Sequence, residues 1–226
     1  MKKIISFSLW GDKPLYVTGA IENVVLASKF YKGWTCRFYV DKSVPTKILN
    51  QIKEKGGEII DLELNDQEHN PIEYATNGIN PGWFWRFEIL NDKEVDRFIV
   101  RDVDSRLSMR EKNCVIDWEM SKKPFHIIRD HPMHGVPILA GTWGATKEFA
   151  SSINYTELKE NFLKMNSTNN AVYGGYDQFF LGTVIYPMIK DTACVHDDYF
   201  NFEPHKKKIP HLKVDEHFIG EVYEVN

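Results

Sequence analysis

One short stretch near the middle of the chain constrains the fold more than any other. The apolar run Phe98–Val100 predicts a buried strand, and the turn after it carries Asp102 and Asp104 with an arginine on either side. In an extended chain, residues two apart point the same way at about 6.6 Å between Cα atoms, so both carboxylates can approach one cation, or one cation and one sugar hydroxyl. Paired hard oxygens suit Mg²⁺ or Mn²⁺, which is normally shared with a phosphate. A D-x-D sequence on a loop is more often a solvated turn, but this one ends an apolar strand, where open α/β sheets bind ligands.

The residues before this stretch alternate between strand-like and helix-like patterns. Helical periodicity separates three predicted strands, one within 1–10, one at 35–40 and one at 58–62. This order predicts a mostly parallel, Rossmann-like central sheet flanked by helices. We therefore expect a single α/β domain over residues 1–226, with a nucleotide-binding half to about residue 104 and a sugar- and acceptor-binding half from about residue 105. No glycine-rich loop follows the first strand, which excludes dinucleotide and Walker-type phosphate loops.

The second half continues the alternation. Ser108 and Glu111 stand at the two ends of a capping-box pattern that begins a helix running to about Met120. Strands are predicted at 125–128, 138–144 and 192–195. The last of them is a buried strand that ends at His196.

Three groups of residues in these segments allow two interpretations. A predicted helix beginning near Trp83 carries Arg86 in the most aromatic turn of the chain, where it can stack as a structural plug or bind an anion. Asp177 falls in the first turn of another predicted helix, where a capping role alone would explain it. His131 and His134 are three apart, but the intervening Pro132 breaks the helix that a zinc pair at this spacing needs, which favours a loop that recognises sugar or phosphate.

Composition excludes several classes of protein. A formal net charge of −4 argues against general nucleic-acid binding, and no apolar run reaches the roughly 18 residues of a membrane span. The N-terminus is too short and interrupted in its apolar part for a signal peptide. Three widely spaced cysteines without metal-site spacing predict a reduced, cytoplasmic compartment. The polar segments 65–81 and 166–175 predict loops that become ordered when a ligand binds.

Several motifs, taken in order along the chain, resemble the GT-A-fold, nucleotide-sugar-dependent glycosyltransferases. They are the D-x-D at 102–104, the later Tyr176–Gln178 and the histidine after the last strand. More narrowly, the stretches 101–106, 129–132, 141–144 and 196–199 look like those of small viral and bacterial glycosyltransferases. The resemblance implies a single GT-A-like domain in the cytoplasm, or in the host cytoplasm for a viral protein. It also implies transfer of a sugar from a UDP- or GDP-sugar donor to a glycan or other hydroxyl acceptor, with Mn²⁺ or Mg²⁺ as cofactor.

The resemblance also implies a metal site. Asp102 would meet the donor ribose or the metal, and Asp104 would bind the metal directly. The third ligand in that fold is often a histidine near the C-terminus. We expect His196 in this role because it ends a buried strand, and His217 is the alternative because its context resembles a histidine motif of glycogenin-like enzymes.

The other implied site residues belong to the donor and the acceptor. The donor set contains backbone along the nucleotide, an acidic residue at the nucleobase, arginines at the phosphates and a glycine-tryptophan stretch, namely Phe7, Ser8, Leu9, Asp41, Arg86, Arg101, Asp102, Gly141 and Trp143. Asp177 and Asp130 are the catalytic candidates. Either could deprotonate the acceptor hydroxyl in an inverting reaction, whereas a retaining reaction requires no such base.

Two rival interpretations remain at the level of sequence. Phosphohydrolases with a strand-terminal D-x-D use the first aspartate as a nucleophile, but they place the motif on the first strand and follow it with Thr or Val, where this chain has Ser105. An inactive, transferase-like carbohydrate-binding domain is the other alternative. Metal-dependent release of a nucleoside diphosphate from nucleotide sugars would separate the three.

Overall fold

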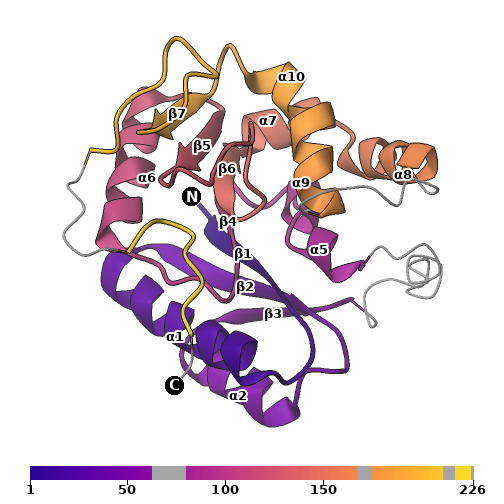
Figure 1. Cartoon of the computed structure of the whole chain (residues 1–226). Coiled ribbons are helices and arrows are strands. Elements are labelled where there is room, and N and C mark those ends of the chain that lie inside the picture. Colours follow the sequence, from indigo (N-terminus) through magenta and orange to yellow (C-terminus); the bar gives the residue numbers. More distant parts are fainter. Residues whose placement is uncertain (63–79, 167–174, 211–216, 225–226) are drawn as a thin grey trace.

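The chain forms one mixed sheet covered by helices on both faces (Figure 1). The computed structural model describes residues 1–62, 80–166, 175–210 and 217–224. Its strands lie in the order β3-β2-β1-β4-β6-β5-β7 and have the bounds β1 Lys3–Leu9, β2 Trp34–Val40, β3 Glu58–Asp61, β4 Arg97–Arg101, β5 Phe125–Arg129, β6 Thr142–Thr146 and β7 Cys194–Asp197. The loops predicted at 65–81 and 166–175 fall almost entirely outside the described residues.

The N-terminal half has the predicted β-α-β-α-β order. Helix α1 (Pro14–Phe30) connects β1 to β2, and α2 (Thr46–Glu54) connects β2 to β3. Strand β1 pairs in parallel with β2 and with β4, and β2 pairs in parallel with β3. Because helices cover both faces of this part of the sheet, β1 is buried along nearly its whole length.

One strand runs against the others. Strand β6 lies antiparallel between β4 and β5, and β7 is parallel to β5. The sheet is therefore mostly parallel, as the sequence predicts. Gly144 on β6 permits this arrangement, since a Cβ there would lie 2.7 Å from the main-chain oxygen of Phe98 on β4. As a result, β1, β4, β5 and β7 all end at the same edge of the sheet.

The helices form two layers. Residues of α1, α2 and α6 (Met109–Ser121) pack in one apolar core. The other core contains residues of α5 (Gly82–Trp85), the 3₁₀ helix η1 (Glu88–Asn91), α7 (Lys147–Ser152), α8 (Tyr155–Asn166), α9 (Tyr176–Phe180), the π-helical turn η2 (Leu181–Ile185) and α10 (Tyr186–Ile189). Among the described helices, none has the length and apolar character needed to cross a bilayer.

The helix cap at Ser108 follows the sequence pattern only in part. The Ser108 hydroxyl accepts a hydrogen bond from the main-chain N–H of Glu111 at 3.2 Å, as an N-cap does. The Glu111 carboxylate does not complete a capping box. It is buried and accepts hydrogen bonds from the Arg101 guanidinium and, at 3.0 Å, from the Tyr31 hydroxyl. Glu111 is therefore the counter-ion of a strand arginine.

The helix predicted at Trp83–Phe87 is shorter than expected. Helix α5 ends at Trp85, and two serines on β1 hold the next residue. The Ser6 hydroxyl donates to the main-chain oxygen of Arg86 at 2.6 Å, and the Ser8 hydroxyl accepts from its N–H at 2.9 Å. Both serines lie on the same face of β1, since they are two residues apart. The central strand thus fixes the backbone of Arg86.

Candidate active site

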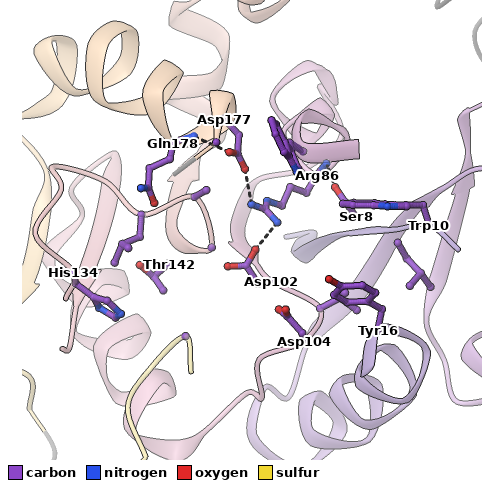
Figure 2. Close-up of a pocket in the computed structure, with 18 residues that line it drawn as sticks. Ser8, Trp10, Tyr16, Arg86, Asp102, Asp104, His134, Thr142, Asp177 and Gln178 are labelled. Carbon is purple, nitrogen blue, oxygen red and sulfur yellow. Dashed lines mark hydrogen bonds and ion pairs between the residues drawn. The ribbon is translucent and has the colours of Figure 1, made fainter. Parts of the chain in front are cut away.

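A cavity of about 390 Å³ opens at the edge where β1 and β4 end (Figure 2). Its walls come from the end of β1, α1, α5, the turn after β4, the segment before β6, the start of α9 and the C-terminal segment. The lining residues are Ser8, Leu9, Trp10, Tyr16, Trp83, Arg86, Asp102, Val103, Asp104, His134, Leu139, Ala140, Gly141, Thr142, Gly175, Asp177, Gln178 and Gly220. Both aspartates of the D-x-D motif are among them.

Asp102 is held in place by a glycine. It directly follows β4, and its side chain is partly exposed to the cavity. A Cβ atom on Gly141 would lie 1.8 Å from the Asp102 Oδ2 atom and 2.5 Å from its Cγ. Only glycine leaves room for the carboxylate at this position, so Gly141 determines where Asp102 lies.

Arg86 connects Asp102 to Asp177 across the cavity. Its Nη1 donates to Asp102 Oδ1 at 2.5 Å and its Nη2 donates to Asp177 Oδ2 at 2.8 Å, as the dashed lines in Figure 2 show. The side chain is nearly buried. Although burial alone would lower it, the pKa of Arg86 is raised by Asp102 and Asp177, so the guanidinium stays charged. One buried cation therefore serves two carboxylates.

Asp104 lies beside this pair, and the nearby positive charges of Arg86 and Arg106 do not offset its burial. Burial and the neighbouring Asp102 carboxylate raise the pKa of Asp104. Figure 2 shows Asp102 and Asp104 on the same side of the cavity. A divalent cation would relieve the repulsion between these two carboxylates, and their oxygens are the ligands that Mg²⁺ and Mn²⁺ prefer. The donor set at the D-x-D motif thus fits a hard divalent ion.

Asp177 has the most perturbed carboxyl group of the cavity. It stands in the first turn of α9, and its Oδ1 accepts the main-chain N–H of Gln178 at 2.8 Å. Burial raises the pKa of Asp177 to about 6, although the Arg86 guanidinium opposes this shift. A carboxyl group with such a pKa can exchange protons near neutral pH. Gln178 adds an amide to the same wall.

The C-terminal segment 217–224 forms one wall of the cavity. The N–H of Tyr223 donates to the main-chain oxygen of Asp104 at 3.0 Å, and the N–H of Ile219 donates to Asp130 Oδ2 at 3.0 Å. Gly220, between these two anchors, lines the cavity. Residues more than 100 positions after the D-x-D motif therefore lie against it.

Asp130 anchors this wall and does not face the cavity. Its carboxylate accepts hydrogen bonds from Arg110 Nε at 2.8 Å and from Arg110 Nη2 at 2.7 Å, besides that from Ile219. The residue is buried and is not among those that line the cavity. Asp130 therefore lies outside the cavity lining, whereas the other catalytic candidate, Asp177, is part of it.

The two candidate histidines lie in different places. His196 is buried on β7, where its Nε2 lies 3.1 Å from Asp117 on α6 and its Nδ1 lies 2.9 Å from His126 Nε2. Neither His196 nor His217 is among the residues that line the cavity. His217 stacks on Tyr223 with ring centroids 4.9 Å apart, and Tyr223 is bonded to Asp104. Of the two, His217 is the one whose segment reaches the D-x-D motif.

Four other predicted donor residues are not among those that line the cavity. Phe7 stacks on Phe38 in a buried core, and Trp143 packs among aromatic rings in the other core. Arg101 is fully buried and donates to the main-chain oxygens of Val100 and Trp143 at 2.7 and 2.9 Å. Asp41 accepts the N–H of Ser43 at 3.0 Å outside the cavity lining. Aromatic and strand-end positions in sequence do not show which way a side chain points.

Seven of the predicted site residues line the cavity, namely Ser8, Leu9, Arg86, Asp102, Asp104, Gly141 and Asp177. The sequence interpretation missed Trp10, Tyr16, Gln178 and Thr142, which line it as well. Trp10 and Gln178 stand next to predicted positions, so adjacency was a signal for both. Tyr16 stands on α1, and no sequence pattern distinguishes it from the other apolar residues of that helix.

The fold is that of the GT-A glycosyltransferases. The galactosyltransferase LgtC, in a structure with donor and acceptor sugar analogues, aligns over 87% of this chain and 73% of its own with a TM-score of 0.55 at 13% identity. Mouse xyloside xylosyltransferase 1 in its apo form aligns over 87% and 84% with a TM-score of 0.54 at 12% identity. Apo GlyE of Streptococcus pneumoniae TIGR4 aligns over 88% of this chain but 46% of its own, with a TM-score of 0.55 at 14% identity.

At these identities the likeness shows the fold. No protein-family model matches the chain, and no curated protein matches it. The assignment of an activity therefore depends on the cavity.

Proposed function

We propose that this protein is a metal-dependent glycosyltransferase that moves a sugar from a nucleotide-diphosphate sugar to a hydroxyl acceptor. The observation that carries the proposal is the cavity at the sheet edge, where Asp102 and Asp104 face one space beside the buried Arg86 guanidinium. Diphosphates are bound by such combinations of a carboxylate-held metal and an arginine. Neighbours with the same fold are glycosyltransferases by name, which supports this class.

The metal would be Mn²⁺ or Mg²⁺, held by Asp102, Asp104 and His217. His217 Nδ1 lies 2.8 Å from Glu221 Oε2, which orients the ring and leaves Nε2 as the nitrogen for a metal. When bound, the ion would neutralise the charge that develops on the departing diphosphate. The hydrogen bond from the Tyr223 N–H to the main-chain oxygen of Asp104 supports this assignment, because the His217 ring stacks on Tyr223.

The protein's own groups divide the substrate between two sides of the cavity. On the β1 side, Trp10 and Tyr16 present stacked rings with centroids 6.4 Å apart, which suit the flat nucleobase of a UDP- or GDP-sugar. On the α9 side, the Asp177 carboxylate and the Gln178 amide suit sugar hydroxyls. Arg86 lies between them, where the diphosphate would be placed.

Asp177 is the carboxylate that we place at the reacting hydroxyl. In its ionised form it accepts a hydrogen bond from that hydroxyl and can take its proton as the acceptor oxygen attacks. The same ionised form holds Arg86 toward the diphosphate through the 2.8 Å ion pair. Ionisation of Asp177 thus supports both the binding of the acceptor hydroxyl and the placement of Arg86 at the diphosphate.

The decisive experiment measures release of nucleoside diphosphate from a panel of UDP- and GDP-sugars with a mixture of glycan acceptors. We expect release that requires Mn²⁺ or Mg²⁺ and is lost in Asp104→Ala. Asp191→Ala, which removes an exposed carboxylate elsewhere, should release as the unchanged protein does. Hydrolysis of the pyrophosphate bond, which releases a nucleoside monophosphate and a sugar 1-phosphate, would indicate a phosphohydrolase. Glycan binding without turnover would indicate a carbohydrate-binding domain.

A further inference from the structure

We propose that the protein has a second metal site, formed by Asp117, Cys194 and His196, for a divalent transition metal that accepts a thiolate, such as Zn²⁺. Asp117 stands on α6, and Cys194 and His196 stand on β7. Strand β7 is at one edge of the sheet, and α6 packs beside it (Figure 1). None of the three lines the cavity of the D-x-D motif. The proposal does not depend on the glycosyltransferase activity.

The spacing of the three ligand atoms matches what zinc requires. Tetrahedral zinc with ordinary Zn–S, Zn–N and Zn–O bonds separates its ligand atoms by roughly 3.4 to 3.6 Å. Here Asp117 Oδ2 lies 3.1 Å from His196 Nε2 and 3.9 Å from Cys194 Sγ. All three ligand atoms lie within 4.8 Å of one another. Changes of at most about 1.3 Å in these separations would therefore place the three atoms around one ion.

A second histidine is placed to orient the first. For His196 to bind through Nε2, its proton must be on Nδ1, which lies 2.9 Å from Nε2 of His126. His126 is fully buried on β5 and can accept that proton in a hydrogen bond. Histidine ligands in metal sites commonly donate their other ring N–H to such a partner. Burial lowers the pKa of His196 to about 4, so its ring is neutral and available to a metal at neutral pH.

The charge of the site suits a divalent ion. As the Cys194 sulfur binds the metal, its thiol proton passes to solvent, and the resulting thiolate with the Asp117 carboxylate balances two positive charges. At present the Lys207 ammonium lies 2.7 Å from Asp117 Oδ2 and supplies one charge. Lys207 is half exposed, so it can turn into solvent when a metal replaces it. Lys207 is thus a competitor of the metal.

Sequence spacing conceals this cluster. Asp117 and His196 are 79 residues apart, and Cys194 and His196 share one strand, where residues two apart point to the same face. A metal here would connect α6 to β7, which are distant in sequence. The softer sulfur ligand distinguishes this site from the oxygen-rich D-x-D motif.

The first test titrates the whole protein with Co²⁺, because cobalt bound to a thiolate gives a sulfur-to-metal charge-transfer absorption that oxygen ligands do not. We expect this absorption at one equivalent in the unchanged protein and in Asp104→Ala, and its loss in Cys194→Ala. Cys36→Ala is the matched control, since Cys36 is also buried and has no such neighbours among the described residues. Absence of the absorption, or its persistence in Cys194→Ala, would overturn the proposal.

The second test measures Zn²⁺ affinity by competition with a chromophoric chelator. Asp117→Asn replaces a partly exposed residue, so it should fold and should weaken binding more than about 100-fold, beyond the range found for partners outside the ligand shell. Lys207→Gln should strengthen binding, because it removes the competing ammonium. If the cluster is only a hydrogen-bonded ion pair, neither substitution changes the affinity for Zn²⁺, and the proposal fails.

Discussion

Gly141 and Asp102 occupy adjoining space so tightly that a single added carbon would lie 1.8 Å from the Asp102 Oδ2 atom. The two residues are 39 positions apart: Asp102 directly follows β4, and Gly141 directly precedes β6. The D-x-D carboxylate therefore depends on a residue that has no polar side chain. This relationship yields a test that leaves both aspartates intact.

Gly141→Ala should disable the site without unfolding the protein. The added methyl group must displace the Asp102 carboxylate, and a misplacement of about 1 Å in a catalytic constellation can cost about 100-fold in rate. We therefore expect donor turnover to fall by about that factor while the far-ultraviolet circular dichroism is unchanged. Gly182→Ala is the control, because a Cβ at Gly182 meets nothing within 4 Å. Normal turnover in Gly141→Ala would show that the position of Asp102 does not matter.

Metal and nucleotide should stabilise the protein jointly. Asp102 and Asp104 offer too few ligands to hold a bare ion tightly, so diphosphate oxygens should complete its shell. Mn²⁺ with UDP or GDP should then raise the melting temperature by more than the sum of the two separate effects. The excess should vanish in Asp104→Ala and persist in Asp191→Ala. If EDTA leaves the effect of the nucleotide unchanged, the metal does not bridge protein and diphosphate.

His217 should control the metal dependence of activity. Because its segment is bonded to Asp104, His217→Ala should shift the Mn²⁺ activation curve to concentrations higher by roughly 10- to 100-fold or more. Glu221→Gln should cause a smaller shift, since Glu221 only orients the ring. His196→Ala, which alters a histidine outside the cavity, should leave the curve in place. A curve that moves only in His196→Ala would return the ligand role to β7.

The rate of transfer should rise with pH through the titration of Asp177. Its pKa is raised to about 6, and the ionised form is the one that holds Arg86 and accepts the hydroxyl proton. Turnover at low donor concentration should therefore increase about tenfold per pH unit below pH 6 and level off above it. In Asp177→Asn the residual rate should lack this acidic limb. An unchanged limb in that variant would assign it to another group, with Asp104 the first candidate.

The same titration has a consequence for stability with a defined sign. A carboxyl whose pKa is raised on folding binds more protons in the folded state, so its contribution to the free energy of unfolding falls as pH rises from about 4 to about 6. The difference in unfolding free energy between Asp177→Asn and the unchanged protein should therefore shift in favour of the variant across this window, by up to about 3 kcal/mol. A difference that stays constant with pH would contradict the raised pKa. Urea unfolding at pH 4 and pH 7 measures it.

Much of the fold could be predicted because local patterns and topology agree. The alternation of apolar strands and helices up to Asp104 indicates a parallel βαβ arrangement, and handedness rules leave few ways to connect it. The antiparallel β6 was not predictable in this way. Its pairing with β4 depends on the close approach permitted by Gly144, which is a contact between residues far apart in sequence.

The candidate site was predictable only where a motif determines the direction in which the side chains point. Asp102 and Asp104 emerge from a strand end, so their position follows from the sheet. Arg101 directly precedes Asp102, but its side chain points away from the cavity and pairs with the buried Glu111 carboxylate. Asp130 directly follows β5, but its partner Arg110 stands in the first turn of α6, and no local pattern reveals that pairing. Side-chain direction at strand ends is the information that the sequence lacks.

The cavity wall formed by residues 217–224 comes from the last described part of the chain. Strands β1 to β7 of the described residues all precede residue 198. A chain cut before residue 217 would keep β1 to β7 and both carboxylates of the D-x-D motif, yet would lack Gly220 and the hydrogen bond to the main-chain oxygen of Asp104. If the proposed function holds, we expect such a truncated chain to lose donor turnover, because one wall of the cavity is missing.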